Sequence, residues 1–401
     1  MAKKKNVPQV RFAGYSDEWV KYQFGDILDK YEDPVATPHD GYERLGVRSH
    51  VKGTFHSYVA PGSELETAQM HRVAADKLLF NITFAWEHAV AITDETDAGK
   101  LVSHRFPQFT FVPEMEPKFF RYVVADDKFR YHLWLSSPGG AGRNRVLNIP
   151  EMLEYQTYLP QKAEQIQLAD WFSNLDAVIV QHQSKLEKMR NLKSSMLEKM
   201  FPKDGADVPE VRFKGFTGAW KRKRFSELYE SVIQKNDLTY GVDKNITVAS
   251  MQYRPDIKVT DIEYLRTYNV LKLGDIAFEG HQSKEFRYGR FVENDIGDGI
   301  VSHIFAVFRP KTDYDLMFWK YAINNERIMR PVLVRCTKAS TMMNDLVSKD
   351  FLAESILVPD IEEQKKIGTV LSEIDRLISL QQEELKKLQS IKKALLEKMF
   401  V

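Results

Sequence analysis

Two stretches of the chain, residues 159–201 and 358–401, place apolar side chains at the first and fourth positions of a repeating heptad. No proline or glycine falls between Phe172 and Met200 or between Leu371 and Met399, so this pattern predicts two long α-helices. At 1.5 Å per residue each helix would be about 60 Å long, and neither can bury its apolar seam alone. We expect the seams to pair through Phe172, Leu175, Ile179, Leu186, Met189 and Met196 in the first helix and Leu371, Ile374, Ile378, Leu385, Leu388 and Leu395 in the second.

Polar residues interrupt both seams at matching places. His182 and Gln381 occupy the fourth heptad position, and Lys193 and Lys392 occupy the first. Polar residues there fix the register and the number of helices at some cost in stability. Antiparallel pairing would put the exit of the first helix beside the entrance of the second. Parallel pairing would force the middle segment to span about 60 Å, so we expect an antiparallel coiled coil.

The helices belong to a longer repeat. Pro160 and Pro359 are separated by 199 positions, a Glu-Gln pair follows each of them, and both helices end in Leu-Glu-Lys-Met-Phe. We expect both prolines in the first helical turn, where the missing N–H is not needed. A second motif, Val-Pro-x-Val-Arg-Phe-x-Gly, begins at Val7 and again at Val208. Two copies of a unit of roughly 200 residues indicate an internal two-fold rather than a solenoid.

The repeat predicts an α+β chain in four parts. Residues 1–158 and 202–357 would form two mixed α/β globular domains, and residues 159–201 and 358–401 the two helices. Short aromatic and β-branched runs in the globular parts predict strands between turn residues. These runs are Phe109–Val112, Tyr122–Val124, Ile246–Ser250 and Ile300–Phe308. Their mixed periodicity does not predict the order of the strands.

Composition narrows the class of protein. The formal net charge is +1, which argues against a uniformly basic nucleic-acid-binding chain but permits local basic patches. Cys336 is the single cysteine, so the sequence predicts no internal disulfide and favours a reducing compartment. The sequence contains no apolar run long enough to span a membrane. We therefore expect a cytoplasmic protein.

Catalytic motifs are absent from the sequence. It contains neither a phosphate-binding loop, nor an HExxH motif, nor a GxSxG motif. Asp360, Glu363 and Lys365 resemble part of a nuclease site, but they lie at a helix start, where acidic residues favour the helix dipole. We interpret His104 and His303, which recur in a repeated apolar motif, as buried core residues. The sequence predicts no catalytic residue, no metal site and no cofactor.

Basic and polar residues in the globular parts are the best candidates for function. Arginine and lysine mixed with glutamine and tyrosine on loops suit a DNA duplex, where some side chains contact phosphates and others base edges. The candidates differ between the two copies, whereas the helices repeat, and this favours two different half-sites. They are Arg44, Arg48, Lys52, Tyr58, Arg143 and Arg145 in the first copy, and Lys244, Gln252, Arg254, Gln282, Lys284, Arg287, Arg290, Arg335 and Lys338 in the second.

The whole pattern resembles the specificity (S) subunit of a type I restriction–modification enzyme. The motifs that carry the resemblance are the two entry motifs, the two Pro…Glu-Gln helix starts and the two Leu-Glu-Lys-Met-Phe ends. It implies two target recognition domains that read an asymmetric, bipartite double-stranded DNA target, with the coiled coil setting the spacer. It also implies a non-catalytic chain whose partners are modification (M) subunits, two in number, and restriction (R) subunits. The M subunits methylate adenine N6 and the R subunits use ATP.

Two other interpretations stay open. A coiled-coil tether that presents two α/β interaction domains would need no methyltransferase partner and would show no salt-dependent affinity for DNA. A stand-alone nuclease or methyltransferase would need motifs that the sequence lacks. The recognised bases and the length of the spacer do not follow from the residues.

Overall fold

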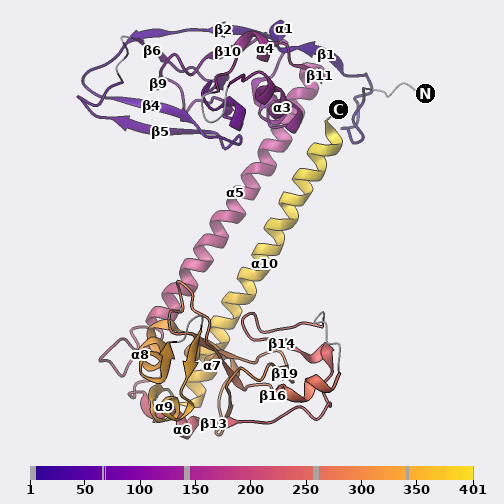
Figure 1. Ribbon diagram of the computed structural model, residues 1–401. Helices are drawn as coiled ribbons and strands as arrows, with labels where there is room; N and C mark the ends of the chain where they lie inside the picture. The colour runs from indigo at the N-terminus through magenta and orange to yellow at the C-terminus, as the bar shows by residue number, and fades with distance from the viewer. Residues whose placement is uncertain are drawn as a thin grey trace. The chain divides into compact units, whose positions relative to one another are not determined.

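The computed structural model describes residues 6–65, 67, 69–139, 145–255, 262–339 and 343–400 of the chain (Figure 1). The chain divides into two compact units. The first consists of Met1–Gln181 together with Leu385–Val401, and the second of His182–Glu384. Each unit therefore contains one globular part and segments of both long helices. Among the candidate residues, Arg143 lies outside the described part of the chain.

The two predicted helices are α5 (Lys162–Lys199) and α10 (Ile361–Met399). Within the first unit, Asp176 of α5 binds Lys392 of α10. Within the second, Lys193 of α5 binds Asp375 of α10 at 2.6 Å. Residue numbers rise along one helix as they fall along the other, so the antiparallel coiled coil is confirmed. Neither helix, nor any other in the described part, is long and apolar enough to cross a membrane.

The predicted seam is the inner side of the helix pair. The twelve apolar residues that we assigned to it are all buried or half-buried, while most other positions of both helices are exposed. Gln381 is 7% exposed and makes a hydrogen bond to His182 across the pair. The polar interruptions of the seam thus have partners on the opposite helix.

The helix starts differ from the prediction. Pro160 and Pro359 precede the helices rather than lying in the first turn, because Gln161 and Asp360 are the residues whose carbonyls accept the first helical hydrogen bonds. The proline carbonyls have another role. The Pro160 carbonyl accepts a bond from the Gln165 side chain at 2.9 Å, and the Pro359 carbonyl accepts the equivalent bond from Gln364 at 3.1 Å.

Each globular part is built on the same antiparallel frame. In the first unit a two-stranded sheet, β1–β11, accompanies a four-stranded sheet in the order β2-β10-β7-β8. In the second unit the sheets are β12–β23 and β13-β20-β17-β18. The strands of the first frame are β1 (Val20–Gln23), β2 (Leu28–Tyr31), β7 (Lys77–Phe80), β8 (Val90–Ile92), β10 (Gln108–Phe111) and β11 (Gln156–Leu159). Those of the second are β12 (Lys221–Arg224), β13 (Tyr229–Val232), β17 (Ile276–Glu279), β18 (Arg290–Glu293), β20 (Val307–Pro310) and β23 (Ser355–Val358).

Short helices pack on both frames. The first carries α1 (Phe24–Ile27), α2 (Pro117–Val123), α3 (Asp127–Leu135), α4 (Ile149–Leu153) and the 3-10 helix η1 (Ala85–Glu87). The second carries α6 (Phe225–Leu228), α7 (Leu316–Ile323), α8 (Glu326–Cys336), α9 (Ser348–Ala353) and the 3-10 helices η2 (Val242–Lys244) and η3 (Ile262–Thr267). The run Tyr122–Val124, predicted as a strand, begins in α2, and this prediction is wrong. The buried residues of α2 are Phe119, Phe120, Tyr122 and Val123, a helical spacing that the three-residue run Tyr122–Val124 is too short to show.

The outer sheets differ between the units. The first unit has a five-stranded sheet in the order β3-β6-β9-β4-β5, and the second has three two-stranded sheets, β14–β15, β16–β19 and β21–β22. The first set comprises β3 (Pro34–Ala36), β4 (Tyr42–Val47), β5 (Thr54–Val59), β6 (Gln69–Arg72) and β9 (Leu101–Val102). The second comprises β14 (Ile246–Thr247), β15 (Gln252–Tyr253), β16 (Asn269–Leu271), β19 (Gly299–Val301), β21 (Thr337–Ala339) and β22 (Asn344–Leu346). In the second unit isolated bridges between Asn245 and Ile300 and between Lys235 and Asn269 place β14 beside β19 and the segment at Lys235 beside β16. The outer strands therefore follow the same order in both units and differ in the length and continuity of their pairing.

The repeated helix ends close the cores. Phe400, next to the end of α10, stacks on Phe119 of the first unit at 5.5 Å between ring centroids. Phe201, which follows α5, stacks on Phe318 of the second unit at 5.6 Å. Each globular core is thus completed by the end of the helix that belongs to the other copy of the sequence repeat.

Candidate nucleic-acid interface

The first group of candidates lies on the β4–β5 hairpin. Arg44 is half-buried on β4, Arg48 and Lys52 are exposed in the connection, and Tyr58 of β5 is 67% exposed. β5 is the edge strand of the five-stranded sheet. Tyr58 lies opposite Glu43 and Arg44 opposite Ser57, so Arg44 and Tyr58 are on opposite faces of the hairpin. The sequence candidates of this group therefore share one hairpin but not one face of it.

Aromatic rings brace this edge. The Arg48 guanidinium lies over the Phe55 ring at 5.1 Å from its centroid and donates a hydrogen bond to the carbonyl of Thr54. Phe55 in turn lies against Gly46, where a Cβ atom would come within 2.3 Å of the ring. An exposed aromatic ring on a glycine stabilises an edge strand that would otherwise lack side-chain packing. Phe55 was not among the sequence candidates.

A buried acid holds β5 from behind. Asp97 is 1% exposed, and its carboxylate lies 2.7 Å from Nε2 of His56 and 2.9 Å from the Thr54 hydroxyl, which donates to it. These contacts anchor two residues of β5 to the segment before β9. The hairpin is accordingly a fixed surface, which suits recognition of a duplex better than a loose loop does.

A cavity of about 480 Å³ opens beside Arg44 and Phe55, with His104 and Arg105 on its wall. Both His104 and its repeat counterpart His303 are exposed in turns, so the interpretation of these histidines as core residues is wrong. The apolar residues around them belong to strands that end just before the turn. Arg105 was missed for the same reason, since nothing in the sequence marks the turn.

Arg145 lies on a separate exposed feature of the first unit. Its guanidinium sits over the Trp134 ring at 4.8 Å from the centroid. Trp134 itself stacks on Tyr131 at 6.0 Å, with 12° between the ring planes. Both rings lie on α3, and both are substantially exposed.

The second unit distributes its candidates over several short elements. Lys244 precedes the β14–β15 hairpin and Gln252 is the first residue of β15. The Lys244 amine lies 4.7 Å from the centroid of the Tyr253 ring. The backbone N–H of Arg254 donates to the Asn245 carbonyl at 2.7 Å, which closes this hairpin. Three further candidates, Gln282, Lys284 and Arg287, are exposed in the connection between β17 and β18.

Two candidates of the second unit are ion-paired within the protein. Arg290 binds Glu279 at 2.8 Å and donates to the Ala249 carbonyl at 2.6 Å. Arg335 of α8 makes two hydrogen bonds to Glu354, at 2.7 and 2.6 Å, and these bonds lower the pKa of the Glu354 carboxyl. Lys338 is exposed on β21.

The repeated sequence motifs build the frame rather than a reactive site. Arg11 of the first entry motif makes two hydrogen bonds to Glu164 at the start of α5, at 2.7 and 2.6 Å. Arg212 and Glu363 form the same pair in the second unit, at 2.7 and 2.8 Å. Each glutamate is 1% exposed. The acidic residues at the start of α10 thus have a structural role. Glu363 forms a buried ion pair, in addition to the favourable position of these residues at the start of the helix.

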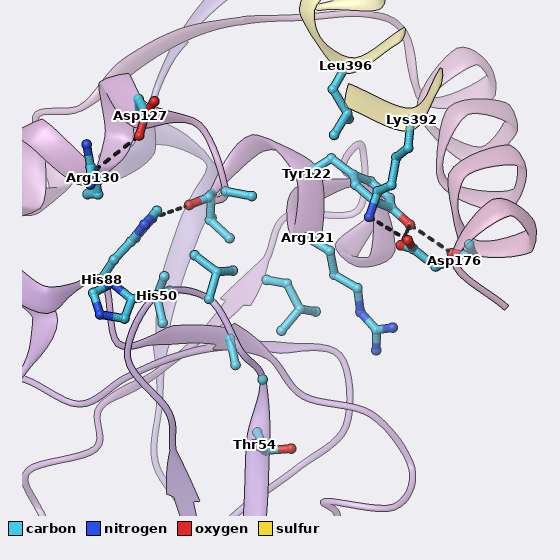
Figure 2. A pocket seen from close by; sticks show the side chains of 18 of the residues that line it. His50, Thr54, His88, Arg121, Tyr122, Asp127, Arg130, Asp176, Lys392 and Leu396 are labelled. Carbon is cyan, nitrogen blue, oxygen red and sulfur yellow. Dashed lines mark hydrogen bonds and ion pairs between the residues drawn. The ribbon is translucent and has the colours of Figure 1, made fainter. Parts of the chain in front are cut away.

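A cavity of about 680 Å³ lies where the globular part of the first unit meets α5 and α10 (Figure 2). Tyr122 and Lys392 both point at Asp176 on its wall, and the Tyr122 hydroxyl donates to that carboxylate at 3.2 Å. Burial raises the pKa of Tyr122 to about 12, so the phenol stays a hydrogen-bond donor at neutral pH.

Strained backbone borders the same cavity. His50 and Val51 have φ angles of 61° and 54°, in the left-handed region that a β-branched residue rarely adopts. Their N–H groups donate to the carbonyls of Glu87 and His88, which holds the strained turn in place. Burial lowers the pKa of His88, whose Nε2 lies 2.6 Å from the Val124 carbonyl.

Comparisons with known proteins agree with this architecture. Residues 219–390 match the family model described as type I restriction modification DNA specificity domain. The S subunit of a type I restriction–modification system from M. genitalium is 14% identical, with 98% of this chain and 99% of that chain covered and a TM-score of 0.60. A chain from a structure of type I R-M complex assembly and conformational transition is 16% identical, with 95% and 97% covered and a TM-score of 0.52.

A further structure, the HsdS subunit from Thermoanaerobacter tengcongensis, is 16% identical over 97% of this chain and 98% of that chain, with a TM-score of 0.48. The family match makes residues 219–390 similar to a type I DNA specificity domain. The M. genitalium S subunit shares the fold of this chain over nearly its whole length. The resemblance to a type I specificity subunit that the sequence predicts is therefore confirmed.

Proposed function

We propose that this chain is the DNA sequence-recognition subunit of a type I restriction–modification complex, and that each unit reads one half of an asymmetric, bipartite target. The observation that carries the proposal is the contrast within the repeat. The two frames have the same strand order and the outer strands also follow one order in both units, but the candidate residues on them differ. At the offset of 199 positions Arg44, Arg48 and Lys52 of the first copy are answered by Asp243, Thr247 and Met251. Two copies of one frame, each with a different surface for DNA, suit a target with two different halves.

We assign the DNA contacts of the first unit to the β4–β5 hairpin. Its exposed cations, Arg48 and Lys52, suit phosphate oxygens, which position a protein on the duplex. Arg44 and the neighbouring Arg105 suit the acceptor atoms of guanine in the major groove, where an arginine can make two bonds at once. In the second unit Lys244, Gln252 and Lys284 take the corresponding roles.

Arg290 and Arg335 rank lower as DNA contacts. The guanidinium of Arg290 already forms an ion pair with Glu279, and that of Arg335 forms one with Glu354. A contact with a base would have to replace or share that ion pair. We assign these two arginines to the support of the surface.

The helix pair would set the spacer and bind the M subunits. Each unit exposes the same two apolar helix positions, Val178 with Ile391 in the first and Leu377 with Leu192 in the second. Exposed apolar side chains at repeated positions suit two copies of one partner. Methyl transfer to adenine N6 would take place on the M subunits, and ATP-driven cleavage on R subunits.

The test is the pattern of adenine methylation in cells that express this chain with its M subunit, read by long-read sequencing. We expect one asymmetric motif of two short halves separated by a fixed gap. If the same M subunit is active with another specificity chain but yields no motif with this one, the coiled-coil tether becomes the better account.

A further inference from the structure

A cluster of three residues joins the globular part of each unit to both long helices. In the first unit it consists of Tyr122 from α2, Asp176 from α5 and Lys392 from α10, and we call it the first junction triad. The Tyr122 hydroxyl donates to Asp176 at 3.2 Å, and Lys392 binds the same carboxylate. The lysine amine also lies 5.6 Å from the centroid of the Tyr122 ring. Figure 2 shows the tyrosine and the lysine converging on the aspartate.

The second unit contains the same cluster. Tyr321 of α7 donates to Asp375 of α10 at 2.7 Å, and Lys193 of α5 binds that aspartate at 2.6 Å. The amine of this lysine is 5.4 Å from the centroid of the Tyr321 ring. All three residues of this second junction triad lie 199 positions from their counterparts, with the two lysines exchanged between the helices.

The triads repeat residue for residue, as the Arg11–Glu164 and Arg212–Glu363 pairs do. The candidate DNA contacts do not repeat, since Arg44, Arg48 and Lys52 are answered 199 positions later by Asp243, Thr247 and Met251. A repeated feature serves whatever the two units have in common, and what they share is the attachment of a globular part to the helix pair. The triads therefore belong to the attachment and not to the reading of particular bases.

A lysine in the seam of a coiled coil is costly. An apolar residue at the first heptad position would pack better than the long charged side chains of Lys193 and Lys392. Each lysine remains 26–28% exposed and each aspartate 34–39%, so solvent weakens their attraction. Stability alone is thus a poor reason for these residues. Alignment is a better one, because the carboxylate accepts from the tyrosine and the lysine together only while the globular part and the opposite helix both stay within hydrogen-bond distance of it.

We propose that the two junction triads are positioning residues that fix the orientation of each recognition domain on the helix pair, and thereby the gap at which the two halves of the DNA target are read. This inference rests on the function proposed above. Each triad touches all three bodies that have to be aligned, namely the globular part and the two helices. Loss of one triad should let one domain tilt while its reading surface stays intact.

The experiment uses the full complex of this chain with its M subunit, and sequencing of methylated adenines. The variants are Tyr122→Phe and Lys392→Met in the first triad, and Tyr321→Phe and Lys193→Met in the second. Tyr122→Phe and Tyr321→Phe each remove one oxygen atom and leave the packing of the ring in place. Matched controls are Tyr264→Phe and Lys393→Met, which change an exposed tyrosine and an exposed lysine outside the triads.

We expect the triad variants to keep the bases of both halves and to accept gaps one base pair longer or shorter. Methylation at these gaps should rise about tenfold, the effect expected when one bond to a charged group is lost. Lys392→Arg should keep the narrow gap because it keeps the charge. The controls should behave as the original chain does.

Two results would count against the inference in different ways. A single unchanged gap in every triad variant, with only a lower melting temperature, would reduce the triads to ordinary stabilising contacts. If the unaltered chain gives no bipartite motif at all, the proposed function fails first, and the positioning role fails with it. Melting temperatures of all variants separate loss of folding from loss of alignment.

Discussion

Gln381 of α10 is hydrogen-bonded to His182 of α5, the residue that lies 199 positions earlier and holds the same place in the repeat. A residue that contacts its own counterpart marks the centre of a duplicated, antiparallel seam. Both side chains sit at a heptad position that apolar residues usually fill. The pair therefore fixes the register of the two helices and does not maximise their stability.

Replacing this pair with leucines tests that assignment. The double variant His182→Leu and Gln381→Leu should raise the free energy of unfolding by about 1–2 kcal/mol, because two apolar side chains are buried in place of a polar contact. His182→Leu alone should lower it, since the amide of Gln381 is then buried without its partner. Urea denaturation of the three proteins measures both effects. A double variant less stable than His182→Leu alone would contradict the assignment of this pair to the register of the helices.

The buried ion pairs of the frame should be costly to break. Arg212→Ala leaves Glu363 charged and 1% exposed, and we expect a loss of about 3–5 kcal/mol. The double variant Arg212→Met with Glu363→Met should lose much less, because no unpaired charge remains. Arg11→Ala offers the matched change in the first unit. Equal losses for the single and the double variant would show that packing, and not charge, dominates at this site.

Glu293 gives the second unit a dependence on pH. This glutamate on β18 is 2% exposed, and burial raises its pKa well above the ordinary value of 4.5. The folded state therefore binds more protons than the unfolded state once the pH exceeds 4.5, so this residue lowers stability progressively as the pH rises toward its folded pKa. Ile92 occupies the matching position of the first frame, opposite Leu78 as Glu293 is opposite Ile276.

The corresponding variant is Glu293→Gln, which cannot ionise. It should raise the melting temperature more at pH 8 than at pH 5, measured by differential scanning calorimetry. Glu285→Gln, at an exposed position of the same unit, serves as the control. A gain that is the same at both pH values would mean that Glu293 does not ionise differently in the folded state.

Candidate contacts to DNA separate into two classes by the salt dependence of binding. Lys52→Ala should weaken binding to all sequences and reduce the slope of log affinity against log salt by about 1, as for one lost phosphate contact. Arg44→Ala should instead relax the choice of bases in one half of the target. Arg335→Ala should mainly lower stability, since that side chain is held by Glu354. Fluorescence anisotropy at several salt concentrations distinguishes these outcomes.

The sequence predicts the repeated parts of the molecule well and the outer sheets poorly. Heptad spacing locates α5 and α10, and Lys193 and Lys392 mark places where the helices make polar contacts across the seam. Heptad spacing does not reveal that these contacts also involve Tyr122 and Tyr321, because both tyrosines lie in short apolar runs without a clear period. One of these runs, Tyr122–Val124, was predicted as a strand for that reason.

The candidate site was only partly accessible from sequence. Arg44, Arg48, Lys52 and Tyr58 do gather on one hairpin, as residues close together in the chain can. Arg105 joins them from a turn far away in sequence, and tertiary pairing of β4 with β9 brings it there. In the sequence Arg335 looked equivalent to the other candidate arginines. In the structure it is paired with Glu354, which lies at the end of α9. Pairings of this kind depend on the fold and leave no local signal.

The most direct measurement compares methylated motifs for two variants of this chain, each expressed with the M subunit. One carries Arg44→Ala in the first unit, and the other carries Gln252→Ala in the second. The account predicts one bipartite motif for the unaltered chain, with the first variant changing the bases of only one half and the second variant those of only the other. If either variant changed both halves, or if the two altered the same half, the assignment of one half to each unit would be wrong.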